Sequence, residues 1–100
     1  MANLINEYTK IANRLTKLYK DELVRLKLVD SGKLLNSIRW FAVQTQTGYK
    51  LSMESLDYFE YLDKKYNISK NIESSIEYEK ILNEIGDLYI KEIFIEIDRD

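Results

Sequence analysis

The N-terminal quarter of this sequence has the periodicity of one long amphipathic helix. From Asn3 to Leu28, apolar side chains recur at steps of three and four residues, which places them along one face of an α-helix. The opposite face is polar, so we expect the helix to pack on one side only. Asn3 is a suitable N-cap, because its side-chain oxygen can accept a hydrogen bond from a first-turn amide. The apolar stripe contains Leu4, Tyr8, Ile11, Leu15, Leu18 and Leu26.

A short helix is expected directly after a break in this periodicity. Asp30, Ser31 and Gly32 interrupt the apolar pattern, and such residues punctuate secondary structure. Asp30 or Ser31 can cap a new helix, since each has a side-chain oxygen that accepts from backbone amides. The short helix then runs from Lys33 to Ser37.

Residues 38–54 have the pattern of a β-hairpin. Residues 38–45 are rich in aromatic and β-branched side chains, and residues 49–54 alternate strictly between apolar and polar. Gly48 lies between the two strands and can adopt the positive φ of a hairpin turn. The alternation predicts that the core face of the second strand consists of Tyr49, Leu51 and Met53.

The C-terminal half predicts two further helices. Apolar and aromatic residues recur at helical spacing over residues 56–66, and residues 67–71 form a polar break. A final helix then begins at a cap provided by Ser74 or Ser75. Residues 90–97 fit either a continuation of that helix or a terminal strand.

Together these segments predict a single α+β domain over residues 1–100. A length of 100 residues suits one hydrophobic core. The expected order is a long N-terminal helix, a short helix, a small antiparallel sheet built on the hairpin, and a C-terminal helix. We expect the N- and C-terminal helices to cover one face of the sheet.

The amino-acid composition argues against an enzyme. Cysteine and histidine are both absent, which excludes thiolate nucleophiles, disulfides and metal sites built from either residue. Four carboxylates follow the hairpin, but Glu54 and Asp63 fall on opposite sides of a helix, and Lys64 offers Glu60 an i,i+4 partner. We therefore expect no catalytic, cofactor-binding or metal-binding residues. The four carboxylates are Glu54, Asp57, Glu60 and Asp63.

The two halves of the chain differ in charge. Residues 1–50 carry nine basic and four acidic side chains, whereas residues 51–100 carry six basic and thirteen acidic ones. One interpretation is two solvated faces that affect solubility only. The other is two complementary patches that meet between neighbouring copies. The candidate residues for that contact are Lys10, Arg14 and Lys17 on one copy and Glu77, Glu84 and Asp87 on the next.

Aromatic residues gather in the middle of the chain, and a thin core does not hide all of them. Those that stay exposed would suit a subunit interface, where aromatic residues are enriched. The candidates for this role are Trp40, Phe41, Tyr58 and Tyr61.

The run from Val29 to Ile38 resembles the signature D-T/S-G-x-L-x-x-S-I of phage tail-completion and minor head-to-tail joining proteins. In that family a long N-terminal helix precedes the signature and a β-hairpin follows it, and the order here is the same. Residues 56–63 stand where the family has a tyrosine followed by an apolar and an acidic residue. The matching signature residues are Asp30, Ser31, Gly32, Leu34, Ser37 and Ile38.

This resemblance implies a structural subunit of a ring or sleeve in the phage neck, where the portal vertex meets the tail. The implied partners are further copies of the chain and other neck, portal or tail proteins. DNA would pass through the ring without sequence-specific contact, and no catalytic residue is implied. No segment has the apolar length of a signal peptide or a membrane span, so we expect assembly in the cytoplasm of a host bacterium.

The main alternative is a small intracellular DNA-binding or antitoxin-like regulator. Basic residues along the first helix could follow a nucleic-acid backbone. The acidic isoelectric point, near 5.2, argues against such a role.

Overall fold

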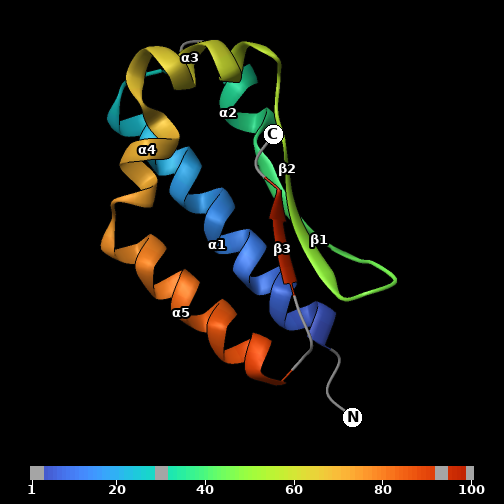
Figure 1. The fold of residues 1–100 in the computed structure, drawn as a ribbon. Helices are drawn as coiled ribbons and strands as arrows, with labels where there is room; N and C mark the ends of the chain where they lie inside the picture. The colour runs from blue at the N-terminus through green and yellow to red at the C-terminus, as the bar shows by residue number, and fades with distance from the viewer. Residues whose placement is uncertain (1–3, 29–31, 92–94, 99–100) are drawn as a thin grey trace.

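The computed structural model describes residues 4–28, 32–91 and 95–98. Within these ranges the fold is α+β, as expected, with a three-stranded sheet that lies along one side of the helices (Figure 1). The expected N-cap residue Asn3 lies outside the described residues. The elements in chain order are α1 (Leu4–Arg25), α2 (Lys33–Ser37), β1 (Arg39–Gln44), β2 (Tyr49–Glu54), α3 (Tyr58–Tyr66), α4 (Ile68–Glu73), α5 (Ile76–Lys91) and β3 (Ile95–Asp98).

Helix α1 lies between the sheet and the C-terminal helices. It packs against β1 on one side and against α4 and α5 on the other (Figure 1). We expected α5 to cover the sheet beside α1, and that arrangement is wrong, because α5 packs on α1 instead. The apolar stripe of α1 is wide enough for both contacts, since Ile11 and Leu18 extend it towards α5.

Helix α1 ends at Arg25 and not at Leu28. Lys27 adopts a left-handed conformation, with φ of 61°. The Lys27 N–H donates to the Val24 carbonyl at 3.0 Å, and the Leu28 N–H donates to the Leu23 carbonyl at 2.9 Å. These two bonds form a Schellman motif, which satisfies carbonyls that the helix end leaves open. The apolar Leu26 and Leu28 still pack against the core from this turn.

Strands β1 and β2 form the expected antiparallel hairpin. Ala42 lies opposite Leu51, and the Thr45 N–H closes the turn by donating to the Gly48 carbonyl at 2.8 Å. Gly48, which closes the turn opposite Thr45, has a positive φ of 156°. Leu51 is fully buried, while Tyr49 and Met53 are partly buried against the core. The expected core face of the second strand is therefore confirmed.

The chain segment after α5 adds a third strand to the sheet. The helix continues to Lys91, and residues 95–98 then pair with β2 in parallel, with Tyr49 opposite Ile95. Both interpretations of residues 90–97 thus hold for different parts of the segment. The sheet is mixed, with order β1-β2-β3, and only its hairpin is antiparallel.

The polar break expected at residues 67–71 is much shorter in the structure. A single left-handed residue, Asn67 with φ of 55°, separates α3 from α4. Helix α4 forms because Ile68 and Ile72 recur at a helical step and are both buried in the core. The next helix, α5, begins at Ile76 and is capped by Ser75, whose hydroxyl accepts a hydrogen bond from the Tyr78 N–H at 3.2 Å.

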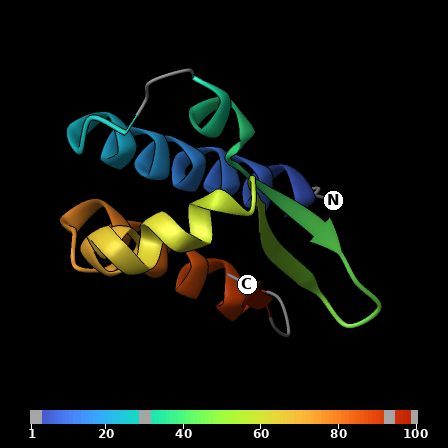
Figure 2. The ribbon, with the colours of Figure 1, turned by 90° about the horizontal axis from the view of Figure 1, so that it is seen from above.

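One hydrophobic cluster contains all of the buried apolar residues that the structure describes. Tyr19 of α1 is central to it, with ring centroids 5.7 Å from Trp40 and 6.0 Å from Phe59. These contacts join the long helix, the first strand and α3. Seen from above, α2 lies on one side of α1, and α3 and α5 lie on the other (Figure 2).

Candidate interaction surfaces

The signature segment begins with a glycine in a conformation that other residues rarely adopt. Gly32 is the N-cap of α2 and has φ of 76°, with no side-chain cap. The Asn36 N–H donates to its carbonyl at 2.9 Å and closes the first turn. We expected Asp30 or Ser31 at the N-cap, and that assignment is wrong, because Gly32 occupies the position. Asp30 and Ser31 themselves lie outside the described residues.

The rest of the signature joins α2 to the end of the hairpin. The Ser37 hydroxyl donates to the Leu34 carbonyl at 2.7 Å and accepts from the Leu56 N–H at 3.2 Å. Leu34 and Ile38 are buried, at 8% and 1% exposure. One hydroxyl thus connects two segments that are far apart in sequence. Leu34, Ser37 and Ile38 therefore have a role in the fold.

Thr16, which no sequence pattern singled out, ties α1 to the sheet. Its hydroxyl accepts from the Trp40 N–H at 2.7 Å and donates to the Ala12 carbonyl at 3.0 Å. The available signal was its position, because Thr16 lies four residues after Ala12 within the buried stripe of α1. A polar residue there needs a partner, and an edge strand supplies one.

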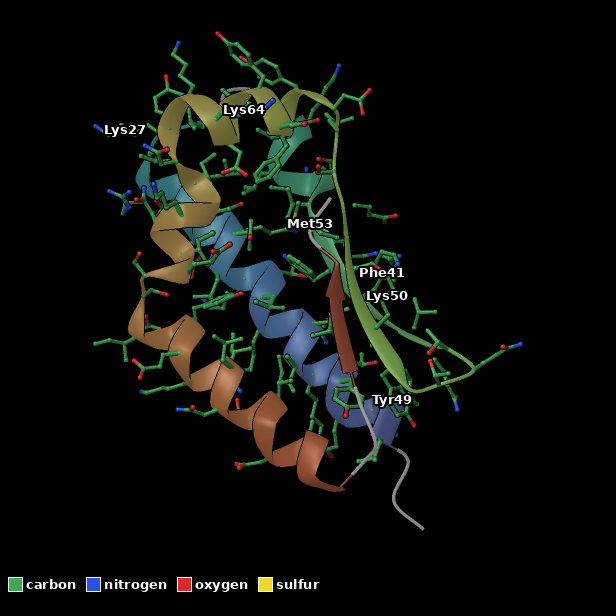
Figure 3. The ribbon with its side chains drawn as sticks, viewed as in Figure 1. Lys27, Phe41, Tyr49, Lys50, Met53 and Lys64 are labelled. Atoms are coloured by element: carbon green, nitrogen blue, oxygen red, sulfur yellow. The ribbon has the colours of Figure 1, made fainter. Side chains whose placement is uncertain are left out.

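The four aromatic interface candidates fall into three environments. Trp40 is only 2% exposed and belongs to the core, so its assignment to an interface is wrong. Phe41 is partly buried on the outer face of the sheet, where the Arg39 guanidinium lies 4.9 Å from its ring centroid (Figure 3). Tyr58 and Tyr61 are exposed.

Tyr58 and Tyr61 form an exposed aromatic surface at the start of α3. They are 58% and 57% exposed, and their rings stack with centroids 5.8 Å apart at an interplanar angle of 16°. Leu56 lies just before them and is 46% exposed. The Lys65 ammonium lies 6.0 Å from the Tyr61 ring centroid. We call the surface made by Leu56, Tyr58 and Tyr61 the α3 aromatic patch.

The six charged interface candidates lie along the contact between α1 and α5 within one chain. Arg14 forms an ion pair with Glu84, and the remaining candidates line the grooves on either side of this pair. Lys17 also pairs with Asp21 at 2.7 Å. The expectation of a basic face and a separate acidic face is therefore wrong, because helix packing brings the two halves together. We call this set of residues the charge seam: Lys10, Arg14, Lys17, Glu77, Glu84 and Asp87.

Next to the charge seam, Glu22 is held in a network between α1 and α4. Its carboxylate accepts from Arg25 Nε at 2.8 Å and Nη2 at 2.6 Å, and from Asn71 Nδ2 at 3.1 Å. The side chain is only 11% exposed. The hydrogen bond from Arg25 lowers the pKa of Glu22 below its ordinary value of 4.5, and burial opposes this effect more weakly.

Two of the carboxylates that follow the hairpin have partners within the fold. Asp63 accepts from the Ser69 N–H at 2.6 Å and from the Ser69 hydroxyl at 2.7 Å, which anchors the first turn of α4. Glu60 lies 3.9 Å from Lys64, the partner expected from its spacing. In the described ranges, no acidic residues gather closely enough to hold a metal ion. No helix among these residues has the apolar length to span a bilayer.

Two open grooves flank these elements. One, of about 510 Å³, runs between α1 and the α4–α5 turn and is lined mainly by charged residues, including Glu22 and Arg25. The other, of about 560 Å³, adjoins Leu56 of the α3 aromatic patch and is also lined by Met53, Phe59 and Asp63 among others.

No protein-family model, curated protein or solved structure matches this chain. The resemblance to tail-completion proteins thus depends on the signature residues and on the order of the elements.

Proposed function

We propose that this chain is a structural subunit of the neck of a tailed bacteriophage, in a ring that joins the portal at the head to the tail. The observation that carries the proposal is the joint made by the signature. Ser37 connects α2 to the residue after the hairpin, and Leu34 and Ile38 anchor the joint in the core. The signature residues thus hold together the elements whose order resembles that of the tail-completion family.

The α3 aromatic patch is the proposed contact surface. Two stacked tyrosines and a leucine are exposed together on one helix and its entry turn. Aromatic side chains supply a large contact area with little loss of conformational entropy, which makes them frequent anchors of interfaces. In this proposal the patch meets a second copy of the chain or the adjacent portal or tail protein.

The proposed place of action is the virion, after assembly in the cytoplasm of the host bacterium. DNA would pass through the ring without base-specific contacts. The regulator alternative is less well supported, because Arg14 pairs with Glu84 and Lys17 pairs with Asp21. Basic side chains that are already paired have less to gain from phosphates.

A head-to-tail joining assay tests this function. Heads and tails are purified separately from cells infected with a phage that lacks this chain, and are then mixed with the purified chain. We expect infectious particles to form, as counted by plaques, only when the chain is present. An unchanged plaque count with and without the chain would overturn the proposal.

A matched pair of variants tests the α3 aromatic patch in the same assay. Tyr58→Ser combined with Tyr61→Ser should reduce joining strongly while leaving thermal melting unchanged, because both side chains are exposed. Leu82→Ser on α5 changes a side chain that is 42% exposed and lies outside the patch, so it should join normally. Equal joining by both variants would exclude the patch as the contact surface.

A further inference from the structure

Strand β1 has an open edge along its second half. The Thr45 N–H bonds to the Gly48 carbonyl across the hairpin. Hydrogen-bonded pairs alternate along an antiparallel ladder, so Phe41 and Val43 also bond to β2. The alternate residues of β1 direct their N–H and C=O groups away from β2, towards the edge of the sheet. These outward residues are Trp40, Ala42 and Gln44.

Only the first part of this edge is covered. The Thr16 hydroxyl accepts from the Trp40 N–H, as the alternation requires. Ala42 and Gln44 have no such partner in the part of the chain that the structure describes. The hairpin also projects beyond α1 towards its turn, as both ribbon views show (Figures 1 and 2). Two residues on the projecting half therefore present unpaired backbone groups.

The sequence of this edge lacks the features that usually prevent strand pairing. Natural edge strands are protected by charged side chains, prolines or bulges. The ten residues from Trp40 to Tyr49 contain no charged residue and no proline, and they are the longest uncharged stretch of the chain. The pairing of β1 with β2 is continuous, without a bulge. An unprotected edge of this composition is a site for another strand.

We propose that the open edge of β1 pairs with the edge strand β3 of a second copy of this chain, so that the sheets of neighbouring subunits join. This inference rests on the proposed ring and specifies the contact between its subunits. Strand β3 is the opposite edge of the same sheet. Its four residues provide two outward-facing positions, which matches Ala42 and Gln44 on β1.

The strand directions support a head-to-tail contact. Strand β1 is antiparallel to β2, and β2 is parallel to β3, so β1 and β3 of one chain run in opposite directions. A rotation about an axis roughly parallel to the strands keeps their directions, so the copy that it places beside β3 brings its β1 antiparallel to β3. Such a contact uses two different surfaces of the subunit, which is what a closed ring requires. A β1-to-β1 contact would use one surface twice and stop at a dimer.

Disulfide cross-linking tests the pairing, because the chain contains no cysteine. Val43→Cys is combined with Glu96→Cys, and in a second variant with Asp98→Cys, to allow for two registers. Position 43 is opposite Lys50, which is opposite position 96, so two strand spacings of about 4.8 Å each separate the cysteines within a chain. That separation prevents an intrachain disulfide.

After oxidation of particles joined in the assay above, we expect one of these double variants to give a ladder of covalent multimers. The single variants Val43→Cys, Glu96→Cys and Asp98→Cys should give none. Dimers from Val43→Cys alone would overturn the proposal in favour of β1-to-β1 pairing. Joined particles without cross-links in either register would overturn the edge contact and leave the proposed function standing. Failure of the unmodified chain to join particles would overturn the function itself.

A proline variant gives a second measurement. Gln44→Pro removes one outward N–H without removing a bond to β2, and Gln44→Thr keeps that N–H. We expect Gln44→Pro to reduce joining at least tenfold and Gln44→Thr to join normally, with similar thermal melting for both. Normal joining by Gln44→Pro would contradict the edge contact.

Discussion

The Thr16 hydroxyl accepts a hydrogen bond from the backbone N–H of Trp40, with 2.7 Å between oxygen and nitrogen. This bond attaches the middle of the long helix to the first strand. The same hydroxyl donates to the Ala12 carbonyl at 3.0 Å, so it is satisfied as both donor and acceptor. The Trp40 N–H, at the edge of the sheet, is therefore bonded to a helix of the same chain.

Thr16→Val should destabilise the fold, because it leaves the Trp40 N–H without a partner beside a buried side chain. We expect a loss of about 1–3 kcal/mol in the free energy of unfolding, measured by urea denaturation. Thr16→Ser retains the hydroxyl and should lose much less. Equal stability of Thr16→Val and the parent chain would show that the bond contributes nothing.

Leu34→Ala should weaken the whole domain and not assembly alone. Leu34 is 8% exposed and belongs to the single core cluster. Truncating a buried leucine costs about 2–5 kcal/mol, a large part of the stability of a small domain. Leu82→Ala is the control, because this exposed residue should change stability by about 0.5 kcal/mol or less. Similar melting curves for the two variants would contradict the described packing of α2.

Trp40 should report on the core and not on assembly. It is the only tryptophan of the chain and is 2% exposed in the isolated subunit. We therefore expect a blue-shifted emission maximum that stays the same when the chain joins heads to tails. Iodide quenching of the free chain should be weak for the same reason. A red-shifted or easily quenched emission in the free chain would contradict the burial of this residue.

The sequence predicts the fold well wherever one periodicity dominates. The stripe of α1 and the strict alternation of β2 identified the core residues Tyr8, Leu15 and Leu51, all of which are buried. Local patterns were less reliable at helix ends. The break after Tyr66 was predicted, and Asn67 there is a residue type that adopts the left-handed conformation more readily than most. The end of α1 was not predicted, because Lys27 adopts this conformation although its residue type does not favour it.

The candidate surfaces were less predictable, because exposure and charge pairing depend on tertiary packing. Trp40 and Tyr58 are both aromatic, yet one is buried by Tyr19 and the other lies on the outside of α3. In the same way, Arg14 and Glu84 are 70 residues apart and meet only because α5 packs on α1. The sequence showed the charges of the two halves but not that Arg14 and Glu84 form an ion pair within one chain.

Glu22 should make stability depend on acid pH. Its pKa is lowered in the folded chain, chiefly by the hydrogen bond from Arg25, so the folded state releases this proton more readily than the unfolded state does. The contribution of the Glu22 carboxylate to the free energy of unfolding is therefore complete above pH 4.5, the ordinary pKa of this group. It is lost as the pH falls through the lowered pKa of the folded chain. Glu22→Gln should lose about 1.5–3 kcal/mol in the free energy of unfolding at pH 7, as expected for hydrogen bonds to a charged group.

Glu22→Gln should also show a smaller fall in stability between pH 5 and pH 3 than the parent chain does. Urea denaturation at a series of pH values measures both effects. Glu79→Gln removes an exposed carboxylate on α5 and is the control for loss of one charge. An unchanged pH dependence in Glu22→Gln would show that another group causes the acid sensitivity.

The ion pair of Arg14 with Glu84 should be detectable in the isolated subunit. Both side chains are about half exposed, at 44% and 50%, so the interaction is screened by solvent and is worth about 0.2–1 kcal/mol. Arg14→Glu should destabilise the chain slightly through repulsion from Glu84, and Glu84→Arg in the same chain should restore most of that loss. Raising the salt concentration to 1 M should reduce the coupling between the two substitutions, because the Debye length falls to about 3 Å.

A double-mutant cycle distinguishes a contact within the chain from a contact between copies. The four chains are the parent, Arg14→Glu, Glu84→Arg and the double variant, each unfolded by urea at a dilution where light scattering shows monomers. At this dilution we expect a coupling energy of about 0.2–1 kcal/mol between the two substitutions, because Arg14 and Glu84 belong to one chain. Coupling that appears only at concentrations where the chain assembles would mean that the charge seam joins neighbouring subunits, and it would reinstate the head-to-tail charge contact that the packing of α5 on α1 argues against.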